Sequence, residues 1–118
     1  MNLRIKNVLI SVSNKNNLSK YSNFLLKQNC NIISTGGTYE YLKYHNNHDN
    51  IKDVESITNT PELFNGRVKT LHPAIFAGLL TPTKKHSDLE KLNTLAFDLV
   101  NVNLYPFDFY VKKKANKY

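Results

Sequence analysis

The chain has 118 residues, which is enough for one compact domain with a modest core and too few for two. Hydrophobic residues make up 41% of it, which argues against disorder, and no apolar run has the length of a membrane span or a secretory signal. Sixteen Lys and Arg residues against nine Asp and Glu residues give a formal charge of +7. Because recognition-helix, zinc-finger and aromatic RNA-binding patterns are missing, this charge favours an anionic small molecule over nucleic acid. We therefore expect a cytosolic domain without a nucleic-acid or membrane partner.

Short β-branched runs alternate with segments whose apolar residues recur at helical spacing. In chain order the sequence predicts strands at residues 6–12, 30–35, 51–54 and 97–107, and helices at 18–29, 39–45, 61–65 and 87–92. Such alternation predicts an α/β layer around a mostly parallel sheet. Cys30 begins the second predicted strand, which favours a buried, inert thiol over a nucleophile.

Polar residues at the ends of these segments predict where the helices begin and stop. Ser13 and Asn14 are potential caps of the first helix, and Asn29 is its expected stop. Thr38 is the expected cap of the second helix. Thr60 precedes Pro61 as the cap of a single helical turn.

Residues 64–78, FNGRVKTLHPAIFAG, are too polar for a buried strand and contain Pro73, so they predict a loop. Arg67 and Lys69 lie two positions apart, which puts both cations on one face of an extended segment. They either hold one anion together or are simply two exposed charges. His72 has no metal-ligand partner at suitable spacing, which favours a turn histidine hydrogen-bonded to the backbone.

The three strongest predicted strands end in hydroxyl-rich or polar segments: SVSNK, STGGT and NLYPF. The carboxyl ends of parallel strands meet at one edge of the sheet, so we expect these segments to share that edge with the loop. The free N–H groups at a helix N-terminus after STGGT suit a phosphate. Each segment alone also fits an ordinary turn, but together they favour a phosphate site. By spacing alone Tyr105 is a core residue.

Four segments carry a resemblance to a known family: LISVSNK, IISTGGT, TPELFNGRVKTLHPAIFAGLL and NLYPF, in that order. They are similar to the N-terminal IMP cyclohydrolase part of the bifunctional purine biosynthesis proteins, which also carry an AICAR formyltransferase. The resemblance implies a three-layer, methylglyoxal synthase-like α/β domain over residues 1–118. It also implies closure of formyl-AICAR to IMP with loss of water, no metal or organic cofactor, and a homodimer.

The resemblance also assigns roles to residues. It makes Lys69 and Tyr105 the catalytic candidates. The nucleotide, and above all its phosphate, would be held by Ser11, Ser13, Lys15, Thr35, Gly36, Gly37, Thr38, Arg67, Thr70 and Asn103. The chain departs from the family at Asn14, where an acidic residue is usual, and at Phe76, where histidine is common.

Compared with the family, the chain is incomplete at its C-terminal end. The family's cyclohydrolase unit continues past NLYPF, whereas here residues 112–118 predict a basic, solvated tail. The formyltransferase part has no counterpart. Retention of Lys69 and Tyr105 favours the enzyme, while the shorter chain favours the alternative, a non-catalytic nucleotide- or phosphate-binding module of the same fold.

Overall fold

The computed structural model describes residues 4–61, 63–64, 70–82, 87–104, 108 and 111–112. Its strands are β1 (Asn7–Ser11), β2 (Asn31–Ser34), β3 (Ile51–Asp53) and β4 (Leu99–Val102). Its helices are α1 (Leu18–Lys27), α2 (Gly36–His45), α3 (Glu55–Thr58), α4 (Pro73–Leu80) and α5 (Ser87–Lys91). Elements near all four predicted strands are present, although β4 is shorter than its prediction, and α3 was not predicted. The predicted helical turn at 61–65 is wrong where it can be compared, because Pro61, Leu63 and Phe64 are not helical, and residues 62 and 65 lie outside the described residues.

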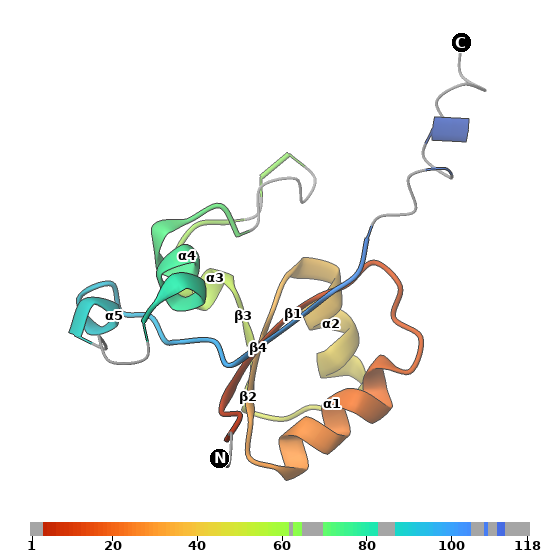
Figure 1. Ribbon diagram of the computed structural model, residues 1–118. Coiled ribbons are helices and arrows are strands. Elements are labelled where there is room, and N and C mark those ends of the chain that lie inside the picture. Colours follow the sequence, from red (N-terminus) through yellow and green to blue (C-terminus); the bar gives the residue numbers. More distant parts are fainter. Residues whose placement is uncertain are drawn as a thin grey trace.

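The four strands form one sheet in the order β3-β2-β1-β4, and every neighbouring pair is parallel. Val8 on the central strand β1 faces Ile32 on β2 and Leu99 on β4, which sets the register on both sides. Parallel neighbours need crossover connections, and α1 and α2 supply them between β1, β2 and β3. The predicted parallel α/β sheet is therefore confirmed (Figure 1).

Helices cover both faces of this sheet, which gives three layers (Figure 1). On one face α1 and α2 bury residues such as Leu25 and Leu42 against Val8 and Ile32. On the other face Ile75 of α4 packs on the strands with a smaller group of apolar side chains. A fully buried aliphatic side chain contributes about 1.5–3 kcal/mol, so the sheet and its two helical layers depend on one another for stability.

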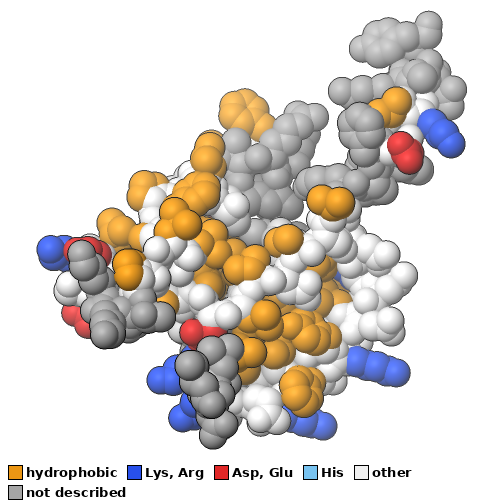
Figure 2. All heavy atoms as spheres, viewed as in Figure 1, with side chains coloured by type: hydrophobic (Ala, Val, Ile, Leu, Met, Phe, Trp, Pro, Cys, Tyr) orange, Lys and Arg blue, Asp and Glu red, His pale blue; other side chains and the backbone are white. Residues whose placement is uncertain are grey.

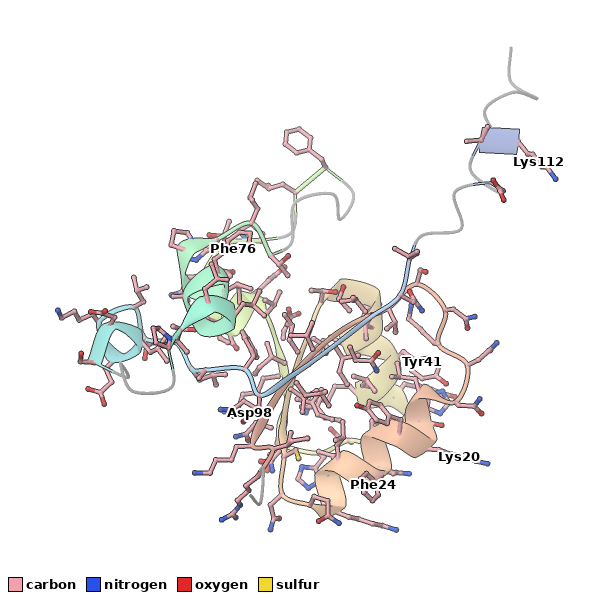
Figure 3. The ribbon with its side chains drawn as sticks, viewed as in Figure 1. Lys20, Phe24, Tyr41, Phe76, Asp98 and Lys112 are labelled. Atoms are coloured by element: carbon pink, nitrogen blue, oxygen red, sulfur yellow. The ribbon has the colours of Figure 1, made fainter. Side chains whose placement is uncertain are left out.

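Asp98 fixes the start of β4 beside β1. One of its carboxylate oxygens, Oδ2, accepts hydrogen bonds from the backbone N–H groups of Lys6 at 2.8 Å and Asn7 at 2.9 Å. The backbone N–H of Asp98 in turn donates to the carbonyl of Asn7 at 2.8 Å. Figure 3 shows Asp98 at the foot of β4, at the amino end of the sheet. β3 ends at Asp53, and the chain returns to the sheet only at this point, more than 40 residues later.

The predicted helix caps are wrong at two helices. α1 begins after Asn17, whose φ of 62° is left-handed and whose side chain does not cap the helix, so neither Ser13 nor Asn14 caps it. α2 begins after Thr35, three residues before the predicted cap Thr38. Thr38 lies inside the helix instead, and its hydroxyl is bonded to the backbone of Val12, the residue after β1. The predicted stop at Asn29 is confirmed by its left-handed φ of 61°.

The prediction of a loop throughout residues 64–78 is also wrong, because α4 begins inside it at Pro73. Proline has no N–H to lose at the first position of a helix, so it begins this helix rather than breaking it. His72 precedes it as the cap, and its Nδ1 accepts a hydrogen bond from the N–H of Ala74 at 3.1 Å. The interpretation of His72 as a backbone-bonded turn histidine is thereby confirmed.

Candidate functional site

The ends of β1 and β2 bring two predicted ligand hydroxyls together. Oγ of Ser11 and Oγ1 of Thr35 lie 2.9 Å apart, so one hydroxyl donates to the other. Ser11 is the last residue of β1, and Thr35 directly follows β2. The parallel sheet therefore creates this pair from residues 24 positions apart, at the edge where the sequence predicted a site.

The N-terminus of α2 opens at this same edge without a side-chain cap. Thr35 occupies the cap position in an extended conformation, but its hydroxyl bonds Ser11 instead of the helix. Gly36 follows with a φ of 26°, a conformation that favours glycine and permits the abrupt change from strand to helix. The first N–H groups of a helix have no intrahelical acceptor and carry a partial positive charge, so this terminus is suited to an anion.

The carbonyl oxygen of Val12 links the ammonium group of Lys15 to the N-terminal turn of α2. It accepts hydrogen bonds from Nζ of Lys15 at 3.0 Å and from Oγ1 of Thr38 at 3.1 Å. Thr38 lies in the first turn of α2, and its hydroxyl also accepts from the N–H of Val12 at 3.2 Å. The half-buried Lys15 ammonium is thus held beside the first turn of α2, where its charge adds to the positive end of the helix.

Asn103 connects the end of β4 to the loop after β1. Its Oδ1 accepts hydrogen bonds from the backbone N–H of Ser13 at 2.8 Å and from the Ser13 hydroxyl at 3.0 Å. Its Nδ2 donates to the carbonyl oxygen of Asn14 at 3.0 Å. The side chain that the sequence assigned to nucleotide binding therefore holds the loop that carries Ser13 and Lys15.

Ser34 is a polar residue at this edge that is not among the site residues predicted from the sequence. It is the last residue of β2 and is fully buried, and its hydroxyl has no hydrogen-bond partner among the described residues. A buried polar group without a partner costs free energy, and such groups in native structures often mark sites. The signal in the sequence was a serine directly after the apolar residues Ile32 and Ile33 and before Thr35.

Several other predicted site residues are not placed beside the Ser11–Thr35 pair. Arg67, Lys69 and Tyr105 lie outside the described residues, so their predicted roles stay predictions. Thr70 is half-buried just before α4, and within the described part of the chain no hydrogen bond joins it to the Ser11–Thr35 pair. Gly37 is exposed in the first turn of α2.

The described side chains at this edge are hydroxyls, amides and one ammonium, which bind anions through hydrogen bonds and charge. In the described segments no three His, Cys, Asp or Glu side chains gather closely enough to hold a metal ion. Nor does any helix in those segments have the length and apolarity that a membrane span requires. The described part of the site is therefore suited to binding a phosphate group rather than to proton transfer.

Curated relatives match this chain along most of its length. It is 44% identical over 111 residues to the bifunctional purine biosynthesis protein PurH of Clostridium botulinum, a match that covers 92% of this chain and 22% of that protein. The corresponding protein of Clostridium perfringens strain SM101 is 46% identical over 105 residues, covering 86% of this chain and 21% of the relative. The chain thus spans about a fifth of the length of these relatives and corresponds to their N-terminal part.

A solved structure shows the same fold. The crystal structure of ForH aligns with a TM-score of 0.69 at 29% sequence identity, over 86% of this chain and 53% of that one. The family model described as MGS-like domain matches residues 17–117, which include strands β2 to β4 and helices α1 to α5. On this match, and with its all-parallel sheet between helical layers, the chain belongs to the family of MGS-like domains.

Proposed function

We propose that this domain binds the purine nucleotide formyl-AICAR through its phosphate and closes it to IMP with loss of water. The observation that carries the proposal is the Ser11–Thr35 hydroxyl pair at the uncapped N-terminus of α2. Lys15 adds a cation beside that terminus. A phosphate there would meet hydroxyl donors, free N–H groups and a positive charge at once.

The chemistry needs donors at the reacting atoms as well as a phosphate site. In the ring closure, the carboxamide nitrogen attacks the formyl carbon, negative charge builds on the formyl oxygen, and that oxygen leaves as water. Fixed donors aimed at this oxygen lower the barrier. We assign this role to Lys69 and Tyr105 on the family resemblance, together with proton relay during the loss of water. The names of the curated relatives support a place in purine biosynthesis.

The deciding experiment incubates the purified chain with formyl-AICAR and follows the absorbance of IMP, with IMP binding measured separately by calorimetry. Turnover above the uncatalysed rate supports the enzyme. Binding of IMP without turnover removes the enzyme and leaves the alternative, a nucleotide-binding module. If IMP and inorganic phosphate both fail to bind, the whole proposal is wrong.

Two lysine variants separate binding from catalysis. Lys15→Ala removes the ammonium beside α2 and should weaken IMP binding by about tenfold to a hundredfold, since a hydrogen bond to a charged group contributes about 1.5–3 kcal/mol. Lys27→Ala is the matched control, because it removes the same charge from the C-terminal end of α1. Lys69→Ala should lower turnover more than it lowers binding. A Lys69→Ala variant that binds and turns over like the parent would count against its catalytic role.

A further inference from the structure

A hollow of about 510 Å³ lies at the amino end of the sheet, between the segment that enters β1 and the C-terminal end of α1. The residues that line it include Arg4, Phe24, Leu25, Lys27, Gln28 and Cys30. Leu25 and Cys30 are buried core residues, so the deeper part of the lining is apolar. This volume is within the range of about 300–1,000 Å³ that is usual for ligand sites, and such sites combine an apolar lining with a few polar groups.

Phe24, Lys27 and Gln28 present one face of α1 to this hollow. They are three and four positions apart, the spacing at which helix residues lie side by side. The Phe24 ring is 60% exposed, and the other two side chains are exposed as well. Figure 3 shows Phe24 projecting from α1 near the end of the helix. A large aromatic ring beside a cation and an amide is therefore available to stack on a planar ligand.

Arg4 adds a second cation from a different segment, and the surrounding chain is cationic. Within the described residues neither Arg4 nor Lys27 forms an ion pair. From Met1 to Tyr39 the sequence contains no Asp or Glu, although it contains Lys or Arg at positions 4, 6, 15, 20 and 27. Figure 2 shows Lys and Arg side chains along the lower edge of the molecule, where Figure 1 places the start of the chain and the end of α1.

Two negative groups near this end are already bonded within the protein. The last carbonyls of a helix carry a partial negative charge, but that of Leu25 accepts from the N–H groups of Gln28 and Cys30, both at 3.1 Å. The carboxylate of Asp98 accepts from two backbone N–H groups at the start of β1. The charges of the two cations in the hollow are therefore available to a ligand.

We propose that this hollow is a second binding site, which takes a nucleoside polyphosphate. Its base stacks on Phe24, and its phosphates pair with Arg4 and Lys27. An uncharged ring would leave the cations unpaired, and an inorganic anion would leave the ring unused, so the combination favours a ligand that carries both.

The site is separate from the carboxyl edge of the sheet. Ile5 lines the hollow, and Ser11 at the carboxyl edge follows it six positions later. At about 3.3 Å per residue of a strand, the two ends lie about 20 Å apart. The proposal thus goes beyond the proposed function and does not depend on it.

The test titrates ATP into the purified full chain by calorimetry, in magnesium-free buffer so that the phosphates keep their charge. Tripolyphosphate and adenosine are separate arms. We expect ATP to bind about tenfold more tightly than either, because each arm lacks one part of the ligand. ATP should also shift the backbone amide NMR signals of residues 24–30 more than those of the first turn of α2.

Variants of the two cations and of the ring locate the binding. Arg4→Ala and Lys27→Ala should each weaken ATP binding about tenfold, since each removes a charge-assisted contact. Lys20→Ala removes the same charge from α1 outside the hollow and should have less than about a twofold effect, because exposed charges are screened. Phe24→Ala should weaken binding about fivefold, whereas Phe24→Tyr keeps the ring and should bind like the parent. Tyr44→Ala, on exposed α2, is the control for the loss of a surface ring.

Lys15 and Lys27 distinguish the two sites. Lys27→Ala should weaken ATP binding and leave the affinity for IMP unchanged, whereas Lys15→Ala should do the reverse. If the parent binds ATP with this pattern but does not bind IMP, the proposed function is wrong and the second site stands.

Three results would overturn the proposal. The first is a folded parent chain that does not bind ATP. The second is tripolyphosphate that binds as tightly as ATP, because the ring would then have no role. The third is ATP binding that is lost in Lys15→Ala, or that falls equally in Lys20→Ala and Lys27→Ala. The former would place ATP at the carboxyl edge, and the latter would show a general effect of charge.

Discussion

Asn103 and Ser13 are bonded twice, since both the N–H and the hydroxyl of Ser13 donate to the Asn103 side-chain oxygen, at 2.8 and 3.0 Å. The two residues are 90 positions apart in the chain. The amide of Asn103 completes the connection by donating to the carbonyl of Asn14. Asn103, the residue after β4, therefore holds the loop in which Lys15 lies beside the N-terminus of α2.

Asn103→Ala should reduce the affinity for IMP several-fold by freeing this loop. It should lower the free energy of unfolding by only about 1–2 kcal/mol, because the three lost hydrogen bonds are exposed and each contributes near the low end of the usual range of about 0.5–1.5 kcal/mol. Calorimetry and urea unfolding measure the two effects. Asn47→Ala, an exposed asparagine in the loop after α2, is the control. Unchanged affinity would show that the loop holds its position without Asn103.

The parallel sheet and its hydroxyl-rich edge were predictable because they depend on local patterns. The apolar runs around Leu9 and Ile33 are typical of strands buried on both faces, and strand–helix alternation leads to parallel order. The meeting of Ser11 with Thr35 then follows from parallel geometry alone. No tertiary information was needed for this part of the site.

The wrong helix caps were predicted at polar side chains that have two possible hydrogen-bond partners. Thr38 and Ser13 both fit helix caps by sequence, yet each bonds a distant segment, Val12 in one case and Asn103 in the other. Local capping preferences contribute about 1 kcal/mol, so tertiary hydrogen bonds of similar strength can override them. The prediction of a loop around Pro73 was wrong for a different reason. Proline disrupts a helix when it lies in the interior, but it is favoured at the first position, where it stands in α4.

Replacing Thr38 tests the link between β1 and α2. Thr38→Val keeps the shape of this buried side chain but removes both hydrogen bonds to Val12. The N–H of Val12 then loses its side-chain partner, which should cost about 1–3 kcal/mol in the free energy of unfolding. Urea unfolding measures this loss. Thr38→Ser retains the hydroxyl and should lose less, and equal losses in the two variants would show that the hydroxyl has no role in stability.

Gly78 in α4 should not tolerate even a methyl group. A Cβ at this position would collide with the carbonyl oxygen of Leu95 and come within 3.0 Å of the Phe97 ring, and the Gly78 carbonyl accepts from the N–H of Phe97 at 3.0 Å. On helix propensity alone, Gly78→Ala would stabilise by about 1 kcal/mol. We expect destabilisation of about 1–3 kcal/mol instead, because a backbone atom cannot move aside as a flexible side chain does. Thermal unfolding decides the sign. Ala77→Gly, the reverse change at the neighbouring half-buried position, is the comparison.

Ile75 tests the smaller of the two core layers. Its side chain is fully buried against β1 and β2, whereas Leu80 on the same helix is 77% exposed. Ile75→Ala should lower the free energy of unfolding by about 2–5 kcal/mol through lost burial and a cavity. Leu80→Ala should change it by less than about 0.5 kcal/mol, as is usual at exposed positions. Similar losses for both would mean that α4 does not pack on the sheet as described.

Cys30 should make stability fall at alkaline pH. Burial raises the pKa of its thiol, with a smaller contribution from Asp98, and the protonated Sγ donates to the carbonyl of Ile5 at 3.3 Å. The unfolded thiol ionises near about pH 8.5, so the folded state holds its proton to higher pH. Stability from this group is therefore fully present below that pH and is lost as the pH rises through the raised pKa of the folded state.

The measurement is urea unfolding from pH 7 to 10, for the parent and for Cys30→Ala. The parent should lose more stability with rising pH than the variant, because only the parent carries the thiol. Tyr21, whose pKa is raised by burial and secondarily by Cys30, ionises in both proteins, so the comparison subtracts the part of its shift that burial causes. As a second readout, a thiol reagent should modify the folded parent far more slowly than the urea-unfolded chain. Parallel pH profiles together with rapid modification of the folded protein would contradict a buried, protonated Cys30.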